Sequence, residues 1–261
     1  MMDKMNVCRI VCIGNELLIG EVVNTNATYI ARNLNRRGYF VDRILCIRDE
    51  YNEISWSINE AMKDGVNYLF LTGGLGPTYD DITMESVAKT LGLELVLHPE
   101  TLRKLEERAK ARGHPLAEAS KKMAYVPKDS RIIPNSRGVA PGVDISLNGL
   151  RIFILPGVPS EMKSMIREYV LKVLPNLGKY YEKKLVVEGV GESLLADTIK
   201  EIAKKYPDIY LKTHPRLYRG KYRLIVHIYV RDIQSPNAIE HVKDAVQVME
   251  RKFGQYVKKI K

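Results

Sequence analysis

Long apolar runs are missing from this sequence, which limits the classes of protein to consider. None of its 261 residues lies in a stretch near the ~18 consecutive apolar residues that a transmembrane helix needs. The first residues, Met1 to Asn6, also lack the basic-then-apolar order of a signal peptide. We therefore expect a soluble, globular, cytoplasmic protein with no membrane partner.

Cysteine and histidine are scarce. The three cysteines, Cys8, Cys12 and Cys46, lie in apolar strand-like runs, and their odd number and C-x3-C spacing fit neither a disulfide framework nor a zinc site. We interpret them as buried structural thiols. The five histidines are scattered without the spacing of metal ligands, so histidine-based catalysis has little support.

Several common catalytic motifs are also absent. The chain contains no G-x-x-x-x-G-K-[ST], no G-x-S-x-G and no H-E-x-x-H, and residues 75–81 do not complete G-x-G-x-x-G. These absences argue against a P-loop nucleotidase, a serine hydrolase of the nucleophile-elbow type and a zinc protease.

Positive charge is present in excess, and it is unevenly distributed. Residues 179–261 hold 18 Lys and Arg against 10 Asp and Glu, a charge of +8, whereas the rest holds 23 against 21, only +2. This asymmetry predicts two domains, residues 1–176 and a basic domain of residues 180–261. The basic domain has either a solvated charged face or an acidic partner such as nucleic acid.

Hydrophobic periodicity assigns the first domain to the α/β class, because predicted strands alternate with predicted helices and such alternation implies parallel pairing. The expected strands are 7–13, 39–47, 68–71, 94–97 and 151–155. The expected helices are 26–37, 52–63, one ending near 91 and one ending near 174, with charged helical material over 99–122. After a linker at 175–178, the second domain reads as α+β. Its expected elements are strand 184–188, helix 193–205, a hairpin of strands 209–213 and 222–231 turning at Arg219-Gly220, and helix 237–253.

The ends of the parallel strands are the expected binding site, because open α/β sheets bind ligands beyond the carboxyl ends of their strands. Four strand ends bear glycine, carboxylate or both: Gly14-Asn15-Glu16, Arg48-Asp49-Glu50, Thr72 to Asp81, and Pro156 to Glu161. Gly73, Gly74 and Gly76 can adopt positive φ and bring their amides to phosphate oxygens. Thr78, Asp80 or Asp81 could cap the following helix, whose N-terminus favours an anion.

Two carboxylates beside a phosphate imply a cation between them. Mg²⁺ is typically bound by one or two carboxylates together with phosphate oxygens and water. We therefore predict a metal position at Asp81 with Glu16 or Asp80, the alternative being that both aspartates only cap the helix. Asp49 and Glu161 are further candidates, although each also suits the first turn of a helix.

Several stretches of the sequence together resemble the CinA-like (competence/damage-inducible) proteins. The matching stretches are Gly14 to Gly20, Asn24 to Asn26, Thr72 to Thr83 (TGGLGPTYDDIT), Lys122 to Ala124, Asn135 with Gly138 to Gly142, and Leu155 to Met162 (LPGVPSEM). The resemblance implies the mostly parallel three-layer α/β sandwich of the molybdopterin-binding (MoaB/MogA-like) type. The sequence departs from the bacterial pattern at Asn15, where an aspartate is usual. We also expect no deamidase domain like that of longer members.

The resemblance also implies an activity and a set of residues. Members of the family are associated with metal-dependent hydrolysis of ADP-ribose to AMP and ribose 5-phosphate, with Mg, Mn or Co as the divalent metal. The catalytic candidates are Asp81, Glu16 and Glu161, and the metal candidates are Asp80, Asp81 and Glu16. The expected phosphate- or substrate-binding residues are Gly14, Asn15, Asn26, Asp49, Thr72, Gly73, Gly74, Gly76, Thr78, Thr83, Gly157, Pro159 and Ser160.

Two other functions stay open. Relatives in cofactor synthesis bind or adenylate molybdopterin, so the substrate is a small nucleotide or a pterin. The second domain resembles the KH-like domain of longer members at Gly189 to Ser193, but the G-x-x-G of a nucleic-acid-binding KH domain is absent. Its tyrosines at 206, 210, 218, 222 and 229 either stack nucleic-acid bases or pack within the protein. The expected assembly is a homodimer.

Overall fold

The computed structural model describes residues 6–178, 180–218, 220–230 and 235–260. Arg219 of the expected hairpin turn, Arg231 of the expected strand and residues 1–5 of the chain start lie outside these ranges. The chain forms two compact units, unit 1 from residues 1–35 and 39–175 and unit 2 from residues 36–38 and 176–261. In the described ranges, no helix has the length and apolar character to cross a membrane.

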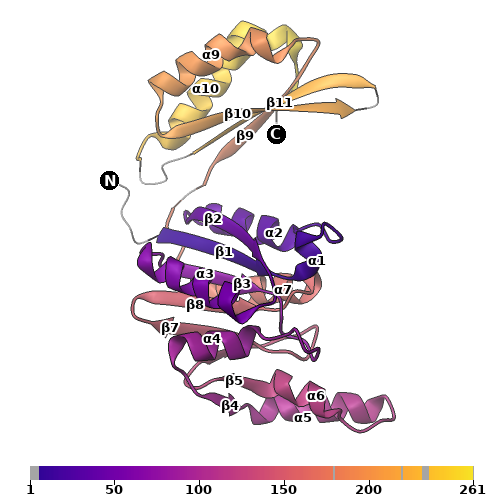
Figure 1. The fold of residues 1–261 in the computed structure, drawn as a ribbon. Coiled ribbons are helices and arrows are strands. Elements are labelled where there is room, and N and C mark those ends of the chain that lie inside the picture. The colour runs from indigo at the N-terminus through magenta and orange to yellow at the C-terminus, as the bar shows by residue number, and fades with distance from the viewer. Residues whose placement is uncertain (1–5, 179, 219, 231–234, 261) are drawn as a thin grey trace. The chain divides into compact units, whose positions relative to one another are not determined.

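Unit 1 is built on a six-stranded sheet with the order β2-β1-β3-β8-β7-β6 (Figure 1). Neighbours among β2, β1, β3 and β8 are parallel, whereas β7 and β6 are added antiparallel. The strands are β1 (Val7–Ile13), β2 (Phe40–Ile47), β3 (Tyr68–Thr72), β6 (Arg131–Ile133), β7 (Gly142–Leu147) and β8 (Leu150–Leu155). This mostly parallel sheet confirms the predicted α/β class.

Helices cover both faces of this sheet, which is why its central strands are almost continuously apolar. Helices α2 (Thr25–Asn35) and α7 (Pro159–Met165) lie on one face, and α3 (Tyr51–Lys63) and α4 (Thr83–Leu91) lie on the other (Figure 1). The short helix α1 (Asn15–Leu18), which periodicity did not indicate, follows β1. Helix α7 continues through a π-helical turn (Ile166–Val170) into α8 (Leu171–Val173).

An extension of unit 1 follows α4. It contains the two-stranded antiparallel sheet of β4 (Leu95–Leu97) and β5 (Tyr125–Pro127), helices α5 (Pro99–Ala111) and α6 (Glu118–Lys121), and a 3-10 turn at Lys122–Ala124. The helical material expected over 99–122 is present, but it is divided between α5 and α6. Helix α5 ends because Gly113 has a left-handed backbone (φ +77°) and Pro115 lacks the amide that a continuing helix requires.

Unit 2 has a four-stranded antiparallel sheet with the order β10-β11-β9-β12, and helices α9 and α10 lie on one of its faces (Figure 1). Its elements are β9 (Glu182–Glu188), α9 (Glu192–Lys205), β10 (Ile209–Tyr218), β11 (Lys221–Val230), α10 (Ala238–Phe253), a 3-10 turn (Gly254–Tyr256) and β12 (Val257–Ile260). The α+β class and the β10–β11 hairpin are confirmed, whereas β12 was not predicted.

The cysteines differ from one another in exposure. Cys8 and Cys12 are buried free thiols, as predicted. Cys46 is exposed, so the prediction of a buried thiol is wrong there. The reason is its position on β2, which forms the edge of the sheet and has only one neighbouring strand.

Candidate functional site

The carboxyl ends of the four parallel strands meet at one edge of the unit 1 sheet, where hydrogen bonds link neighbouring ends. The Gly14 amide after β1 donates to the Ile47 carbonyl of β2 (3.1 Å), and the Gly73 amide after β3 donates to the Leu155 carbonyl of β8 (3.1 Å). Both amides are therefore used by the protein. The expectation that the Gly73 amide binds phosphate is wrong.

Asn26 and Thr72 connect three of these segments. The Asn26 amide nitrogen donates to Thr72 Oγ1 (3.1 Å) and to the Gly157 carbonyl (2.8 Å), and the Thr72 hydroxyl donates to the Pro156 carbonyl (2.8 Å). Thr72 is only 2% exposed, so it positions the strand ends and does not contact a ligand, contrary to expectation. Asn26 Oδ1 is different: this acceptor is buried and has no donor among the described residues.

The turn after β3 requires glycine at two consecutive positions. Gly73 has φ +118° and Gly74 has φ +64°, and a Cβ on Gly73 would overlap the Ile13 carbonyl oxygen. Unlike the Gly73 amide, the amides of Gly74 and Gly76 have no hydrogen-bond partner in the described part of the chain. Two of the three predicted phosphate-binding amides therefore remain available.

Thr83 holds this turn against the start of α4. Its hydroxyl donates to the Gly73 carbonyl (2.9 Å), and its amide donates to the Gly74 carbonyl (3.1 Å). Thr83 is fully buried, with 0% of its surface exposed. The expectation that Thr83 binds substrate is wrong, since its hydroxyl is directed into the protein.

The two aspartates close a turn of their own. Asp81 accepts hydrogen bonds from the Thr78 amide (2.9 Å) and the Thr78 hydroxyl (2.6 Å), and Asp80 is a second acceptor for that hydroxyl. Helix α4 begins at Thr83, and its N-cap residue Ile82 provides no side-chain hydrogen bond. The prediction that Thr78, Asp80 or Asp81 caps this helix is therefore wrong.

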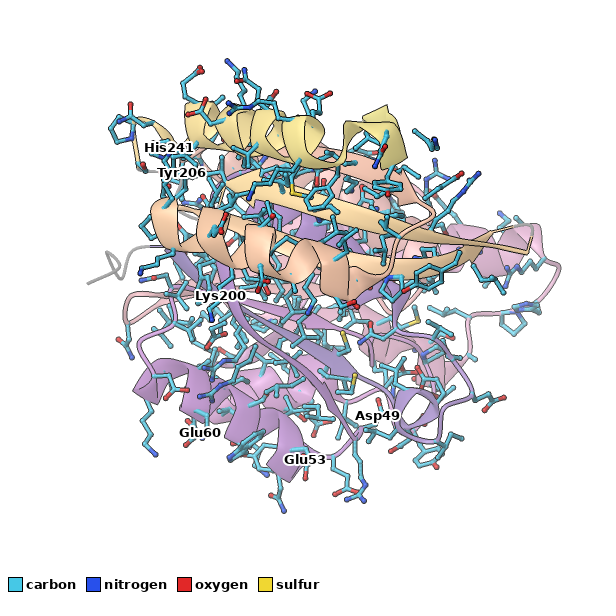
Figure 2. The ribbon with its side chains drawn as sticks, turned by 90° about the horizontal axis from the view of Figure 1, so that it is seen from above. Asp49, Glu53, Glu60, Lys200, Tyr206 and His241 are labelled. Carbon is cyan, nitrogen blue, oxygen red and sulfur yellow. The ribbon has the colours of Figure 1, made fainter. Side chains whose placement is uncertain are left out.

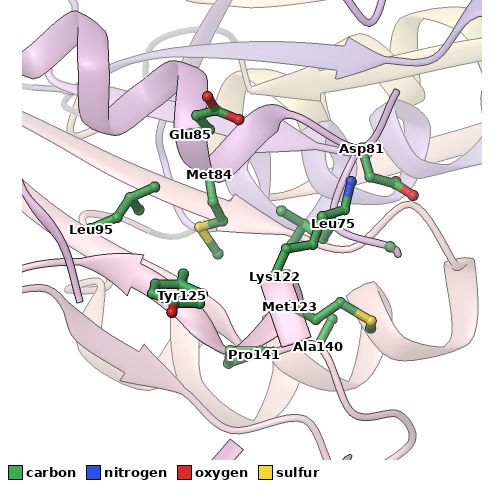
Figure 3. A pocket seen from close by; sticks show the side chains of 12 residues that line it. Leu75, Asp81, Met84, Glu85, Leu95, Lys122, Met123, Tyr125, Ala140 and Pro141 are labelled. Carbon is green, nitrogen blue, oxygen red and sulfur yellow. The ribbon is translucent and has the colours of Figure 1, made fainter. Parts of the chain in front are cut away.

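A pocket of about 170 Å³ opens beside the glycine turn (Figure 3). Asp81 and Lys122 lie close together at one end of it, and Met84, Leu95 and Tyr125 lie toward the other. Its remaining lining residues are Gly74, Leu75, Gly76, Glu85, Met123, Ala140 and Pro141. The pocket therefore joins a polar end, with available amides, to an end lined mainly by apolar side chains, where Glu85 lies beside Met84.

Lys122 is a residue of this pocket that the sequence reasoning did not select. Its ammonium group donates to the Thr78 carbonyl. The pKa of Asp80 is lowered, mainly by the hydrogen bond from Thr78 and also by the Lys122 charge. The stretch Lys122 to Ala124 matched the family pattern, and that match was the signal that could have identified the lysine.

Glu16, Asp49 and Asp80 bring negative charge from three strand ends into one region. Burial raises the pKa of Asp49, and the neighbouring charges of Glu16 and Asp80 raise it further, although the Asn15 amide donates to Asp49 Oδ2 (2.8 Å). The Glu16 carboxylate lies where a Cβ on Gly14 would be. In the described ranges, no three Asp, Glu, His or Cys side chains are arranged as a ready metal site.

Glu161 lies on the first turn of α7 and holds a neighbouring loop. Asn135 donates its amide nitrogen to Glu161 Oε2 (2.7 Å) and to the Ala140 carbonyl (2.9 Å), and it accepts from the Gly138 amide (2.8 Å). A Cβ on Gly138 would overlap the Glu161 carboxylate. Asn135 and Glu161 thus position the loop that brings Ala140 to the pocket.

The remaining predicted residues lie along the same edge. Gly157, Pro159 and Ser160 are exposed at the start of α7, and Asn15 is exposed in α1. The predicted site residues therefore come from the four strand ends and the helices directly after them, except Asn26, which lies on α2 after the short helix α1. They differ in whether their polar groups are free for a ligand or already used by the protein.

The comparisons with known proteins agree with this architecture. Residues 9–176 match the family model described as "Probable molybdopterin binding domain". A protein of Saccharolobus islandicus is 40% identical over 254 residues, which cover 96% of this chain and 94% of the relative. A protein of Metallosphaera sedula is 39% identical over 251 residues, or 94% of each chain.

A solved structure is similar to unit 1. The crystal structure of the protein CinA, with unknown function, from Thermoplasma acidophilum is 34% identical and has a TM-score of 0.60. The match covers 66% of this chain and 100% of that chain.

Proposed function

The chain belongs to the family of the probable molybdopterin binding domain and is CinA-like, and from this premise we propose that it is a metal-dependent hydrolase of a nucleotide diphosphate. The proposed substrate is ADP-ribose or a similar compound, and the proposed products are AMP and a sugar phosphate. The observation that carries this proposal is the pocket in which available glycine amides and Lys122 adjoin an apolar end.

The two ends of the pocket suit the two parts of such a substrate. Met84, Leu95 and Tyr125 provide apolar surface for a flat base. The amides of Gly74 and Gly76 and the ammonium group of Lys122 provide donors for phosphate oxygens. A diphosphate linked to a base would therefore have each part beside groups that favour it.

Asn26 supports a ligand with a hydroxyl group. Its Oδ1 atom is buried without a donor, although its amide nitrogen is used twice by the protein. A buried acceptor without a donor costs free energy, about 1–3 kcal/mol in typical measurements. A sugar hydroxyl that donates to Asn26 Oδ1 would remove this cost when the substrate binds.

The donor type of the residues present fits a divalent metal, although the described side chains are not arranged as a ready site. Glu16, Asp49, Asp80 and Asp81 offer only carboxylate oxygens, which Mg²⁺ prefers, and the charges of Glu16 and Asp80 add to the effect of burial in raising the pKa of Asp49. Asp80, Asp81 and Glu16 are the proposed holders of the ion. When bound, such an ion would stabilise negative charge on the phosphates.

The chain's own residues would perform the remaining tasks. Asp81, held by two hydrogen bonds from Thr78, is the rigid carboxylate of the pocket. Glu16 is exposed after β1 and is the proposed acceptor of a proton from the attacking water. Glu161 would act mainly through the loop that it holds with Asn135.

The experiment is to incubate the purified protein with ADP-ribose and Mg²⁺, Mn²⁺ or Co²⁺ and to measure AMP by chromatography. We expect AMP release with at least one metal, and its loss by about 100-fold or more in Asp81→Asn. Asp197→Asn, an exposed aspartate on α9, is the matched control and should retain activity. No AMP above the no-enzyme background with any of the metals would contradict the proposal.

The family match favours a second candidate, binding or adenylation of molybdopterin in the same pocket. Calorimetric titration separates the two candidates. Binding of ADP-ribose without binding of molybdopterin supports the hydrolase, whereas the opposite result supports the second candidate.

A further inference from the structure

Both helices in the described part of unit 2, α9 and α10, lie on the same face of its sheet, and the other face carries neither of them (Figure 1). Strand alternation directs Leu211, Val226 and Ile228 toward α9 and α10, and all three are buried. The opposite face carries the alternating residues of each strand. These are Tyr210, Lys212, His214 and Arg216 of β10, Arg223, Ile225, His227 and Tyr229 of β11, and Glu182, Lys184, Val186 and Glu188 of β9. We call this surface the open face.

Aromatic rings form a continuous row on the open face. Tyr229 is at its centre: its ring centroid is 5.2 Å from that of Tyr210, 6.0 Å from that of Tyr180 and 4.8 Å from that of His227. His214 continues the row, 6.3 Å from His227. Tyr210, on the edge strand, is 39% exposed. The row therefore offers exposed ring surface at Tyr210 and His214, joined through the half-buried rings of Tyr229 and His227.

The other tyrosines of unit 2 have different positions. Tyr206 is buried on the helix side, where its ring stacks on His241 with centroids 4.6 Å apart (Figure 2). Tyr222 shares the helix side of β11 with Leu224 and is 48% exposed. The side chain of Tyr218 lies outside the described part. Of the five tyrosines that the sequence suggested for base stacking, Tyr210 and Tyr229 are shown to lie on the open face.

Positive charge flanks the ring row. Lys212 and Arg216 lie on the same face as Tyr210 and His214, and in the described part of the chain neither forms an ion pair. The two acids of the face are already paired, Glu188 with Arg223 and Glu182 with Lys184. The face therefore has cations in excess, next to rings spaced for stacking.

We propose that the open face binds single-stranded nucleic acid. Unpaired bases would stack on Tyr210 and the neighbouring rings, while Lys212 and Arg216 would contact the phosphates. Ring surface alone would also suit an apolar partner, but the two unpaired cations beside it favour an anionic chain with flat bases. Duplex nucleic acid fits less well because its bases are stacked on each other. This surface belongs to unit 2 and does not depend on the proposed hydrolase.

The test measures fluorescence anisotropy of labelled oligouridylate and oligothymidylate with the full chain at low and rising salt. We expect both to bind at low salt and the affinity to fall as salt rises. Tyr210→Leu should weaken binding by about tenfold, the typical effect of losing one stacked base, whereas Tyr210→Phe should bind normally. Tyr222→Leu, from the other face of the hairpin, is the matched control and should have no effect.

A charge variant tests the phosphate contacts separately. Lys212→Gln should reduce the slope of log affinity against log salt by about 0.7, the value expected for one phosphate contact on a single strand. Lys200→Gln, on α9 at the helix side (Figure 2), should not change the slope.

Three outcomes would overturn the proposal. One is no anisotropy change with either oligonucleotide at low salt. Another is binding that Tyr210→Leu and Lys212→Gln leave unchanged. The third is a dimer, seen by light scattering, that Tyr210→Leu converts to monomer, because the open face would then be an interface between two copies of the chain. Thermal unfolding confirms that each variant is folded.

Discussion

The Asp81 carboxylate lies in the space that a side chain at Gly76 would fill: a Cβ there would be 2.5 Å from Asp81 Oδ2. The turn can therefore place this carboxylate beside the Gly76 amide only if residue 76 is glycine. The pairing connects the glycine of the motif with the acid that follows it five positions later.

Gly76→Ala should displace the Asp81 carboxylate and lower AMP release by about tenfold or more, because loss of positioning at a reacting group is costly. The fold should persist, since Gly76 is half-buried in a turn outside the sheet. The measurement is AMP release together with thermal unfolding. Gly254→Ala, where an added Cβ meets no atom within 4 Å, is the control. Full activity in Gly76→Ala would show that Asp81 need not keep this position.

Lys122→Met should weaken ADP-ribose binding by at least about tenfold, because it removes the proposed charge-assisted hydrogen bond to phosphate. It also removes the positive charge of Lys122, which helps to lower the pKa of Asp80 after the larger effect of the hydrogen bond from Thr78, so that pKa should rise. Titration calorimetry measures the first effect and NMR titration the second. Lys121→Met changes the adjacent lysine, which pairs with Glu118, and should leave both unchanged. Equal affinity in the two variants would exclude Lys122 from the phosphate site.

Asp49→Asn should raise the melting temperature of the metal-free protein. The pKa of Asp49 is raised in the folded chain, first by burial and then by Glu16 and Asp80, so the ionised carboxylate destabilises the fold at neutral pH. This destabilisation is lost as the pH falls through the folded pKa toward the unfolded value near ~3.9. The difference in melting temperature between Asp49→Asn and the wild type should therefore become smaller as the pH is lowered through this range.

The same substitution should reduce the increase in melting temperature that Mn²⁺ causes, since one negative charge near the ion is removed. Glu21→Gln, an exposed acid in the loop after α1, is the control and should respond to Mn²⁺ as the wild type does. If Mn²⁺ raises the melting temperatures of Asp49→Asn and the wild type equally, the Asp49 carboxylate does not contribute to metal binding.

Arg9→Met should lower the free energy of unfolding by about 3 kcal/mol, because it leaves a partly buried carboxylate without its partner. Arg9 is 1% exposed on β1 and its guanidinium bonds Asp42 (2.5 Å) and Asp64 (2.7 Å). Adding Asp42→Asn should restore much of the loss, since the unpaired charge is then gone. Urea unfolding measures both. Lys104→Met, which breaks an exposed pair with Glu100 on α5, should change stability little.

Local sequence indicated the four parallel strands of the main sheet and the larger helices, and it suggested the location of the candidate site, although it missed strand β7. Apolar runs such as Val7–Ile13 indicate strands covered on both faces, and the alternation with helices implies parallel pairing. Parallel strands have their carboxyl ends at one edge, so Glu16, Asp49 and Asp81 were expected together without coordinates. Glycine at positions 73 and 74 was likewise readable, because few other residues adopt a positive φ.

Short edge elements were not readable in the same way. Strands β5 and β6 are three residues each, too few for a period to appear. Strand β12 follows α10 after a single 3-10 turn and gains its place by pairing with β9. Such strands are stabilised mainly by their partners, which lie far away in the sequence.

Only the tertiary structure decided which polar groups of the motif remain available to a ligand. Gly73, Gly74 and Gly76 look equivalent in the sequence, yet the Gly73 amide is bonded to Leu155 on a neighbouring strand. The sequence suggests that Thr83 binds a ligand, but in the structure its hydroxyl donates to the Gly73 carbonyl. Lys122 reaches the site from a distant segment. Each of these outcomes depends on a hydrogen bond between segments that the fold brings together, and local periodicity and turn chemistry do not contain that information.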